Sequence, residues 1–369
     1  IQMIKNMTVL GLFGGASLNS LELSLVQTDG IDVHEIIKTA VVPYPEPLVM
    51  DIRSVIGKRV CDLSSLQGNI QIQQLQNEMT DFYIEAVHDF CTPEEFDEIG
   101  IDSLTICNNP TNKCSYQLEQ GHELSRKFGR RVVTHFHKAD LLSGGQASPL
   151  TPAFFNAVGQ HIEHPVLFID LEAVSSLIYL GESGELLAFD CAPGLAMIED
   201  WTFRHANMQT DYNGRLAITG KIHTQIAESL LHHKFLRKNP PKSLDILCFS
   251  DKKEHLEGLS LEDGTATATA FIAQAIYQAV QDFLPQQPAE IYAAGEGIKN
   301  PSLMRFLKHV FKNHQLKSIT DLNPDFKAVG AISTAFNTAR RIYALPITYP
   351  GTTGAYEPMT GGEIYEEKQ

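Results

Sequence analysis

Three glycine-bearing turns are the segments of this sequence best suited to bind a ligand. They are Gly14-Gly15, Gly144-Gly145 and Gly295-Glu296-Gly297. Glycine permits positive φ and lets the backbone approach a ligand closely, as phosphate-binding loops require. Any one of these turns could be an ordinary tight turn. Their recurrence after strand-like segments in both halves of the chain favours a nucleotide or a sugar phosphate.

Asp190 is the candidate catalytic side chain. It ends an apolar run and precedes Cys191-Ala192-Pro193-Gly194. A carboxylate held on rigid backbone at the end of a strand can accept a proton from water or from a hydroxyl group. An aspartate that only caps a turn has the same sequence signature, so both interpretations stay open on spacing alone.

Asp140 has the same ambiguity, because it lies just before the Gly144-Gly145 turn. Close to it, His135 and His137 alternate in the sequence, and we expect them to share one face of a strand. A metal site would need a third ligand, and none lies close in the sequence. We therefore predict hydrogen-bonded or solvated imidazoles here and no metal.

The elements that must position these residues follow one plan twice. Met7–Phe13, 21–26 and 33–42 are apolar or alternating runs typical of a three-stranded meander, and 68–89 has helical spacing. A second set of three such runs covers 165–171, 177–180 and 186–190. Two meanders in one chain predict two related lobes, each a mixed sheet with helices on its faces, and a ligand cleft between them.

The C-terminal part adds three helices and a strand. Ser260 with Asp263 three residues later predicts the start of a helix over 260–284. A strand over 291–294 runs into the third glycine turn and then a helix over 301–312, and a last helix covers 328–343. Strand, glycine turn and helix form a geometry in which backbone N–H groups can face an anion.

The composition excludes several classes of partner. The 369 residues contain 29 Lys and Arg against 44 Asp and Glu, a net charge of −15. Binding to nucleic acid or to an anionic membrane needs basic surface, so neither is expected. No window approaches the roughly 20 apolar residues of a membrane span, and we expect a soluble cytoplasmic protein.

Six scattered cysteines, without metal-site spacing, are predicted to be reduced thiols: Cys61, Cys91, Cys107, Cys114, Cys191 and Cys248.

The order of these motifs resembles the anhydro-N-acetylmuramic acid kinases, a family of the actin-like sugar kinase and Hsp70 superfamily, over essentially the whole chain. Residues 139–150 resemble A-D-x-x-x-G-G-x-G-A-P-L, residues 189–194 resemble F-D-T-G-P-G, and residues 295–304 resemble G-G-G-A-x-N-x-x-L-M. Further likenesses cover the loop at 11–22 and the segments 211–214, 239–243 and 353–355.

The resemblance implies an α/β, two-lobed actin-like (ribonuclease H-like) ATPase fold with a central cleft. We expect a first lobe of 1–127 with 345–369 and a second lobe of 128–344. Such kinases open a 1,6-anhydro amino sugar hydrolytically and phosphorylate it during peptidoglycan recycling, with ATP and Mg as cofactors. The expected partners are an amino sugar and a nucleotide, and a homodimer is left open.

The resemblance also implies roles for individual residues. Asp190 would be the base that activates the attacking water. The nucleotide and its phosphates would contact Gly14, Gly15, Ser17, Asn19, Gly295, Gly297 and Asn300. The sugar would contact Asp140, Gly144, Gly145, Gln146, Pro193 and Gly194. No set of metal ligands is predicted within the protein.

Several departures from the family pattern fall in the ligand loops. Asn19 stands where the family has Asp, and Glu172 and Glu296 stand where it has glycines that admit phosphate. The family's D-F-R is His135-Phe136-His137, and only Ser103-Leu104-Thr105 represents its S-H-G-Q-T. Carboxylates in a phosphate site repel the ligand. The alternative hypothesis is therefore a catalytically inactive pseudokinase of the same fold that acts as a binding or interaction subunit.

Overall fold

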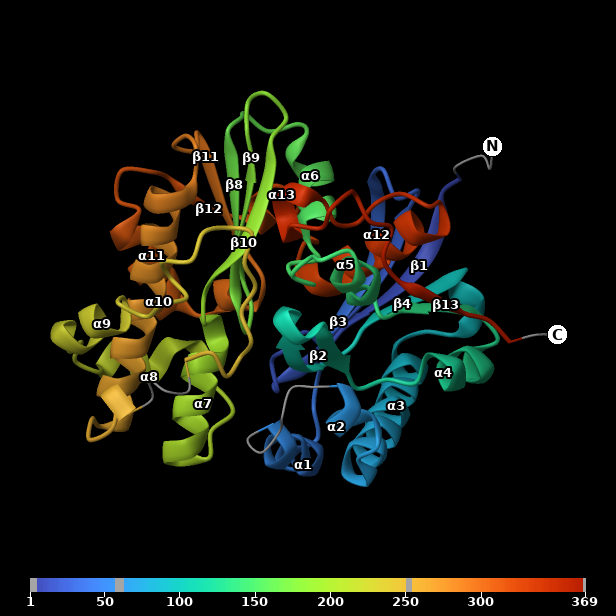
Figure 1. Ribbon diagram of the computed structural model, residues 1–369, viewed down its shortest axis with the longest axis horizontal. Coiled ribbons are helices and arrows are strands. Elements are labelled where there is room, and N and C mark those ends of the chain that lie inside the picture. Colours follow the sequence, from blue (N-terminus) through green and yellow to red (C-terminus); the bar gives the residue numbers. More distant parts are fainter. Residues whose placement is uncertain (1–4, 57–62, 250–253, 368–369) are drawn as a thin grey trace. The chain divides into compact units, whose positions relative to one another are not determined.

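The computed structural model describes residues 5–56, 63–249 and 254–367, and the chain divides into two compact units (Figure 1). Unit 1 contains residues 1–160 and 325–369, and unit 2 contains residues 161–324. The expected lobe boundaries, after residues 127 and 344, lie elsewhere, because α6 (Pro152–Gly159) and α12 (Val329–Ile342) pack against each other in unit 1. Cys61 lies outside the described residues.

Unit 1 is built on a six-stranded mixed sheet in the order β13-β7-β4-β1-β2-β3. β1, β2 and β3 form an antiparallel meander, β4 and β7 continue the sheet parallel to β1, and β13 joins β7 antiparallel. The strands are β1 (Met7–Phe13), β2 (Ser20–Thr28), β3 (Val33–Pro43), β4 (Glu98–Asp102), β7 (Arg131–Thr134) and β13 (Glu363–Tyr365). A separate hairpin is formed by β5 (Thr105–Asn109) and β6 (Cys114–Gln117).

The helices of unit 1 bury the apolar residues of this sheet. α12 packs against β1, β2 and β4, and its residues are buried along nearly the whole length of the helix. The other helices of unit 1 are α1 (Glu46–Ile56), α2 (Leu63–Gln67), α3 (Ile70–Phe90), α4 (Gly121–Phe128), α5 (His137–Leu142) and α13 (Pro350–Thr353). The predicted meander and the helix predicted over 68–89 are thus confirmed.

Unit 2 repeats the plan with a five-stranded sheet in the order β10-β9-β8-β11-β12. β8, β9 and β10 form the antiparallel meander, and β11 and β12 extend it parallel to β8. The strands are β8 (Val166–Leu171), β9 (Ser175–Leu180), β10 (Leu186–Ala192), β11 (Glu290–Ala294) and β12 (Leu316–Ser318). Because the strand orders of the two sheets correspond, the duplicated plan predicted from the sequence is confirmed.

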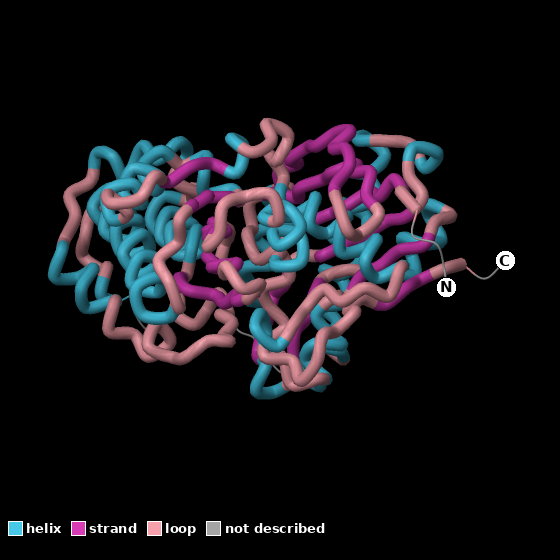
Figure 2. Tube along the Cα trace, turned by 90° about the horizontal axis from the view of Figure 1, so that it is seen from above, coloured by secondary structure: helices cyan, strands magenta, loops and turns pink. Residues whose placement is uncertain are grey.

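The helices of unit 2 gather around α10 (Leu261–Phe283), which is labelled in Figure 1. Figure 2 shows the helices of the chain in cyan, seen from above. α10 packs against four other helices and against β9 and β10. Ser260 caps it, because its hydroxyl accepts the N–H of Asp263 at 3.1 Å, as the sequence predicts. The other helices are α7 (Gly194–Ala206), α8 (Arg215–Thr219), α9 (Thr224–Leu230) and α11 (Pro301–Val310). Among the described residues, no helix is both long and apolar enough to cross a bilayer.

One expectation about local structure is wrong. His135 and His137 do not share the face of a strand, because β7 ends at Thr134. His135 has φ +54°, which turns the chain out of the sheet, and His137 is the first residue of α5. The expectation that the two imidazoles form hydrogen bonds is confirmed below.

Candidate functional site

In unit 1, three parallel strands end at one edge of the sheet. Phe13 of β1 pairs with Asp102 of β4, and β7 runs parallel beside β4. The Gly14-Gly15 turn follows β1 directly, and the N–H of Gly14 donates to the carbonyl of Asp102 at 2.8 Å. The segments that follow these strands therefore meet at the carboxyl edge of the sheet, where ligands of α/β proteins bind.

A cavity of about 360 Å³ opens at this edge, which is large enough for a small ligand. Its wall comes from the β5–β6 hairpin, α5, the end of α2, Gln76 of α3, and strand β13. It is lined by Gln67, Gln76, Lys113, Ser115, Tyr116, Gln117, His135, His137, Lys138, Leu141, Leu142, Glu363 and Tyr365. Amide, hydroxyl and imidazole groups together with two tyrosine rings suit a ligand rich in hydroxyl groups.

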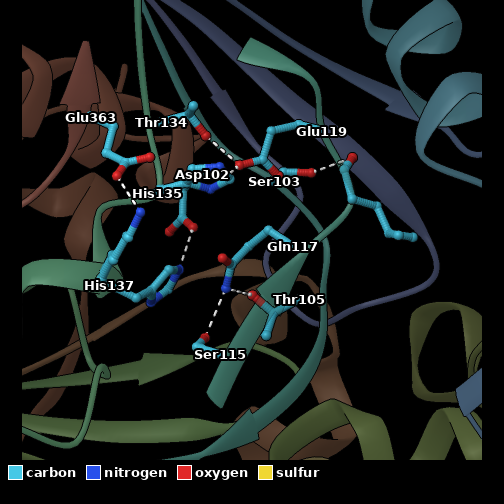
Figure 3. Close-up of polar contacts among 12 residues, drawn as sticks. Asp102, Ser103, Thr105, Ser115, Gln117, Glu119, Thr134, His135, His137 and Glu363 are labelled. Carbon is cyan, nitrogen blue, oxygen red and sulfur yellow. Dashed lines mark hydrogen bonds and ion pairs between the residues drawn. The ribbon is translucent and has the colours of Figure 1, made fainter. Parts of the chain in front are cut away.

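His137 lies at the wall of this cavity between two acceptors. Its Nε2 is 3.1 Å from Asp102 Oδ1 (Figure 3), and its Nδ1 is 3.0 Å from the carbonyl oxygen of Ala147. Because a carboxylate and a carbonyl can only accept, the ring can donate to both only when each nitrogen carries a proton. Burial lowers the pKa of His137, but the charge and hydrogen bond of Asp102 outweigh it and raise the pKa overall. The two acceptors and the raised pKa both favour the imidazolium form of His137.

His135 forms a second pair of imidazole and carboxylate in the same wall. Its Nδ1 is 2.8 Å from Glu119 Oε1, and the Thr134 hydroxyl donates to the same oxygen (Figure 3). The Glu119 side chain is fully buried. Burial lowers the pKa of His135, whereas the hydrogen bond and the charge of Glu119 raise it, with a net increase.

Asp140 is fully buried and organises the second glycine turn. Its Oδ2 accepts the N–H of Ala147 at 2.8 Å, and its Oδ1 accepts the hydroxyls of Thr348 at 2.7 Å and Thr353 at 2.5 Å. The N–H of Gln146 donates to the carbonyl of Thr353 at 2.9 Å. Asp140 thus ties the turn that contains Gly144 and Gly145 to the segment before the C-terminus.

The first glycine turn is anchored by its own hydrogen bonds. The Ser17 hydroxyl accepts the N–H of Asn19 at 3.2 Å, and the carbonyl of Asn19 accepts the N–H of Tyr44 at 3.0 Å. Glu22 is buried in β2 and accepts the N–H of Ala331, at the start of α12, at 3.3 Å. A carboxylate is favoured at that helix N-terminus, so Glu22 holds α12 onto the sheet.

In unit 2, Asp190 is buried near the end of β10, where the strand has an irregularity. Its Oδ1 accepts the Ser176 hydroxyl at 2.7 Å, and its Oδ2 accepts the N–H of Leu244 at 2.8 Å. Burial raises its pKa to about 6; the two hydrogen bonds oppose this and the nearby charge of Asp170 adds to it. A carboxylate with a pKa near neutrality is suited to exchange a proton with water.

Lys242 is a second buried ionisable group close to Asp190. Its carbonyl accepts the N–H of Asp190 at 3.0 Å, and its Nζ donates to the carbonyls of Phe235 at 3.3 Å and Leu236 at 3.1 Å. The Nζ also lies 4.3 Å from the ring centre of Phe283. Burial lowers its pKa to about 8. Lys242 therefore fixes the backbone that holds Asp190.

Glu172 and Glu296, the two unexpected acids of unit 2, lie in adjacent turns. Because β8 and β11 are parallel neighbours with Asp170 opposite Ala294, the residues after these strands come together. Glu172 Oε1 accepts the N–H of Glu296 at 3.0 Å. Burial raises the pKa of the Glu296 carboxyl group. A carboxylate of the chain itself thus occupies a backbone donor of the third glycine turn.

The remaining predicted residues of unit 2 support these turns. Asn300 caps α11, since its Oδ1 accepts the N–H groups of Ser302 and Leu303 at 3.0 and 3.1 Å. Pro193 and Gly194 begin α7. Gly194 has φ +56°, and a Cβ there would lie 2.3 Å from the carbonyl oxygen of Glu172, so only glycine fits. Gly297 packs against Leu171 in the same way.

Sequence reasoning missed most of the cavity wall. Lys113, Gln117, Lys138 and Glu363 have no recognisable motif, and they come from segments far apart in the chain. The histidine pair was the available signal, but its alternating pattern suggested a strand. The ion pair between Lys138 Nζ and Glu363 Oε1, at 2.5 Å, joins α5 to β13 across this wall.

Comparison with known proteins identifies the family. Residues 7–367 match the model of anhydro-N-acetylmuramic acid kinase. The chain belongs to this family. An anhydro-N-acetylmuramic acid kinase of Paramagnetospirillum magneticum is 32% identical over 362 residues, which are 96% of this chain and 99% of the relative. The kinase of Rhodopseudomonas palustris is 32% identical over 96% of this chain and 98% of the relative. The kinase of Zymomonas mobilis is 30% identical over 97% of this chain and 100% of the relative. Family membership and the duplicated sheets confirm the predicted α/β, actin-like fold.

Kinases of this family use ATP, and the third glycine turn can receive an anionic oxygen. Gly295 has φ +82°, and a Cβ there would lie 2.7 Å from Glu172 Oε1, so the carboxylate stands where a phosphate oxygen would fit. ATP held here would contact the N–H of Glu296 and would supply the phosphoryl group. Among the described residues, no three His, Cys, Asp or Glu side chains could hold a metal ion together.

Proposed function

We propose that this protein is an anhydro-N-acetylmuramic acid kinase, a cytoplasmic enzyme of peptidoglycan recycling. It opens the 1,6-anhydro ring of the amino sugar with water and phosphorylates the freed hydroxyl with Mg-ATP. Family membership over residues 7–367 is the observation that carries the proposal. The relatives covered at full length are kinases of this name.

The cavity of unit 1 supports the sugar side of this function. Its volume of about 360 Å³ and its polar lining suit an amino sugar. The substrate named for the relatives is an acid, and Lys113 in the cavity lining carries a positive charge that favours a carboxylate. In this proposal the turn around Gly144, Gly145 and Gln146, braced by Asp140, forms the adjoining part of the sugar site.

Asp190 supports the chemical step. A buried carboxylate with two hydrogen bonds is fixed in direction, and its raised pKa lets it take a proton from water near neutral pH. In the proposal Asp190 is the base, Pro193 and Gly194 shape the sugar side next to it, and Gly14, Gly15, Ser17, Asn19, Gly295, Gly297 and Asn300 form the nucleotide side.

A second candidate function is a pseudokinase that binds its partners without catalysis. The contact between Glu172 and the N–H of Glu296 favours it, because a carboxylate already fills one donor of the third glycine turn. Measuring sugar binding and phosphoryl transfer separately distinguishes the two functions.

Replacing Gln117 with methionine is expected to weaken sugar binding about tenfold. Gln117 is buried in the cavity wall, where its Nε2 donates to the Ser115 hydroxyl at 2.8 Å, and loss of one polar contact costs about 1.4 kcal/mol. Calorimetric titration with 1,6-anhydro-N-acetylmuramic acid measures this. Gln281→Met, at an exposed position of α10, is the control and should bind as the wild type does. Equal binding by the Gln117 variant would exclude the cavity as the sugar site.

A further inference from the structure

The pair of His135 and Glu119 has the arrangement of a proton-transferring dyad. The carboxylate lies 2.8 Å from Nδ1, so Nδ1–H donates to it, and this fixes the ring direction. The ring belongs to the wall of the cavity, and its other nitrogen, Nε2, remains for a ligand. An imidazole oriented by a buried carboxylate is a common source of general acid and base catalysis.

The backbone at His135 is held in an unfavourable conformation. Its φ of +54° lies in the left-handed region, which is unfavourable for a non-glycine residue. The neighbouring Thr134 is fully buried and its hydroxyl binds Glu119. The surroundings therefore keep His135 against the carboxylate although a strand conformation would be less strained. Strain of this kind is concentrated at functional sites.

The charges around the ring favour its protonated form. Glu119 faces Nδ1 from the segment after β6, and Glu363 of β13 adds negative charge. Lys138 of α5 opposes them but is paired with Glu363. Tyr365 of β13 packs edge-on against the ring, with 6.2 Å between ring centres. The negative charges of Glu119 and Glu363 thus stabilise a proton at Nε2.

We propose that His135 is a catalytic general acid that lets this protein hydrolyse the anhydro ring without ATP. This inference takes its ligand class from the proposed function. Water adds its oxygen to C1 as the C1–O6 bond breaks, and the electron pair of that bond goes to O6. O6 takes the proton from His135 Nε2. The proton lost by the water passes to solvent, and His135 is reprotonated from solvent. The product is the open sugar with a free O6 hydroxyl.

The test measures two products from 1,6-anhydro-N-acetylmuramic acid. The free C1 hemiacetal reports ring opening, and ADP reports phosphoryl transfer. We expect wild-type protein to open the ring in the absence of ATP. His135→Asn should lower that rate about 100-fold or more and leave calorimetric sugar binding within about threefold. Asparagine tolerates φ +54°, so this variant should fold, and His135→Gln provides a second check. His122→Gln, at an exposed position of α4, is the matched control.

The pH profile adds a readout that a structural role would not change. Wild-type ring opening should fall as pH rises through the pKa of His135, because the acid loses its proton. In Glu119→Gln this fall should occur at lower pH, since the carboxylate no longer stabilises the imidazolium ion.

The outcomes separate this inference from the proposed function. Ring opening that needs ATP and is unaffected by His135→Asn would overturn the inference and leave the kinase function standing. Ring opening without ATP that depends on His135, with no ADP formed at any ATP concentration, would support the inference and contradict the kinase function. Absence of ring opening under both conditions would overturn both.

Discussion

Replacing Glu172 with glycine is expected to tighten ATP binding about 10- to 100-fold. Glu172 Oε1 accepts the N–H of Glu296 at 3.0 Å, and ATP must displace it to use that donor. A charge-assisted hydrogen bond of this kind contributes about 1.5–3 kcal/mol. The substitution removes this competitor and also one negative charge from the phosphate side. Calorimetric titration with ATP, without sugar, measures the change.

Two further variants make this result specific. Glu172→Gln removes the charge but keeps an oxygen that can accept the N–H of Glu296, so its affinity should lie between wild type and Glu172→Gly. Glu182→Gly removes an acid from the exposed turn between β9 and β10 and should bind ATP as wild type does. If wild type already binds ATP as tightly as Glu172→Gly, then Glu172 does not restrict the site.

Replacing Asp190 with asparagine is expected to lower the rate of sugar opening by about 100- to 10,000-fold, as is typical when a general base is removed. Asparagine can still accept the N–H of Leu244 and donate to the Ser176 hydroxyl, so binding of sugar and ATP should persist. The wild-type rate should rise with pH through about 6, where Asp190 ionises, and this limb should be absent in the variant. Asp282→Asn, at an exposed position of α10, is the control.

The stability of the same variant has a predicted sign. The folded-state pKa of Asp190, about 6, lies above the ordinary value of 3.8 for an aspartate, so ionisation favours the unfolded state. Wild-type protein should lose on the order of 3 kcal/mol of unfolding free energy from this group as pH rises from about 4 to about 6. Asp190→Asn lacks that loss. Urea denaturation at pH 4.5 and pH 7.5 measures the free energy of unfolding of both proteins. If the variant shows the same change with pH as wild type, burial of Asp190 does not destabilise the folded protein.

The sequence was sufficient to predict the elements of both units. The alternating and apolar runs of the two meanders became β1–β2–β3 and β8–β9–β10, because period-two patterns leave one sheet face apolar. Ser260 marked the start of α10, because a serine hydroxyl can accept one of the backbone N–H groups that lack a partner at a helix N-terminus. These predictions depend on local patterns, which a sequence displays directly.

The cavity of unit 1 could not be predicted in the same way. Its wall joins Gln67, the β5–β6 hairpin, α5 and β13, and their proximity depends on the order of strands in the sheet. The alternation of His135 and His137 suggested a strand, whereas the left-handed backbone at His135 directs the two rings to different carboxylates, Glu119 and Asp102. The sequence likewise placed acids in two turns of unit 2 but could not show that Glu172 binds the backbone of the other turn.

Incubation of wild-type protein with 1,6-anhydro-N-acetylmuramic acid and millimolar Mg-ATP, followed by mass spectrometry of the sugar and assay of ADP, tests the central claim most directly. We predict a sugar that has gained water and one phosphoryl group, with ADP formed in equal amount and only when the sugar is present. A sugar recovered unphosphorylated, from protein that binds both ligands, would contradict the kinase function and favour the pseudokinase.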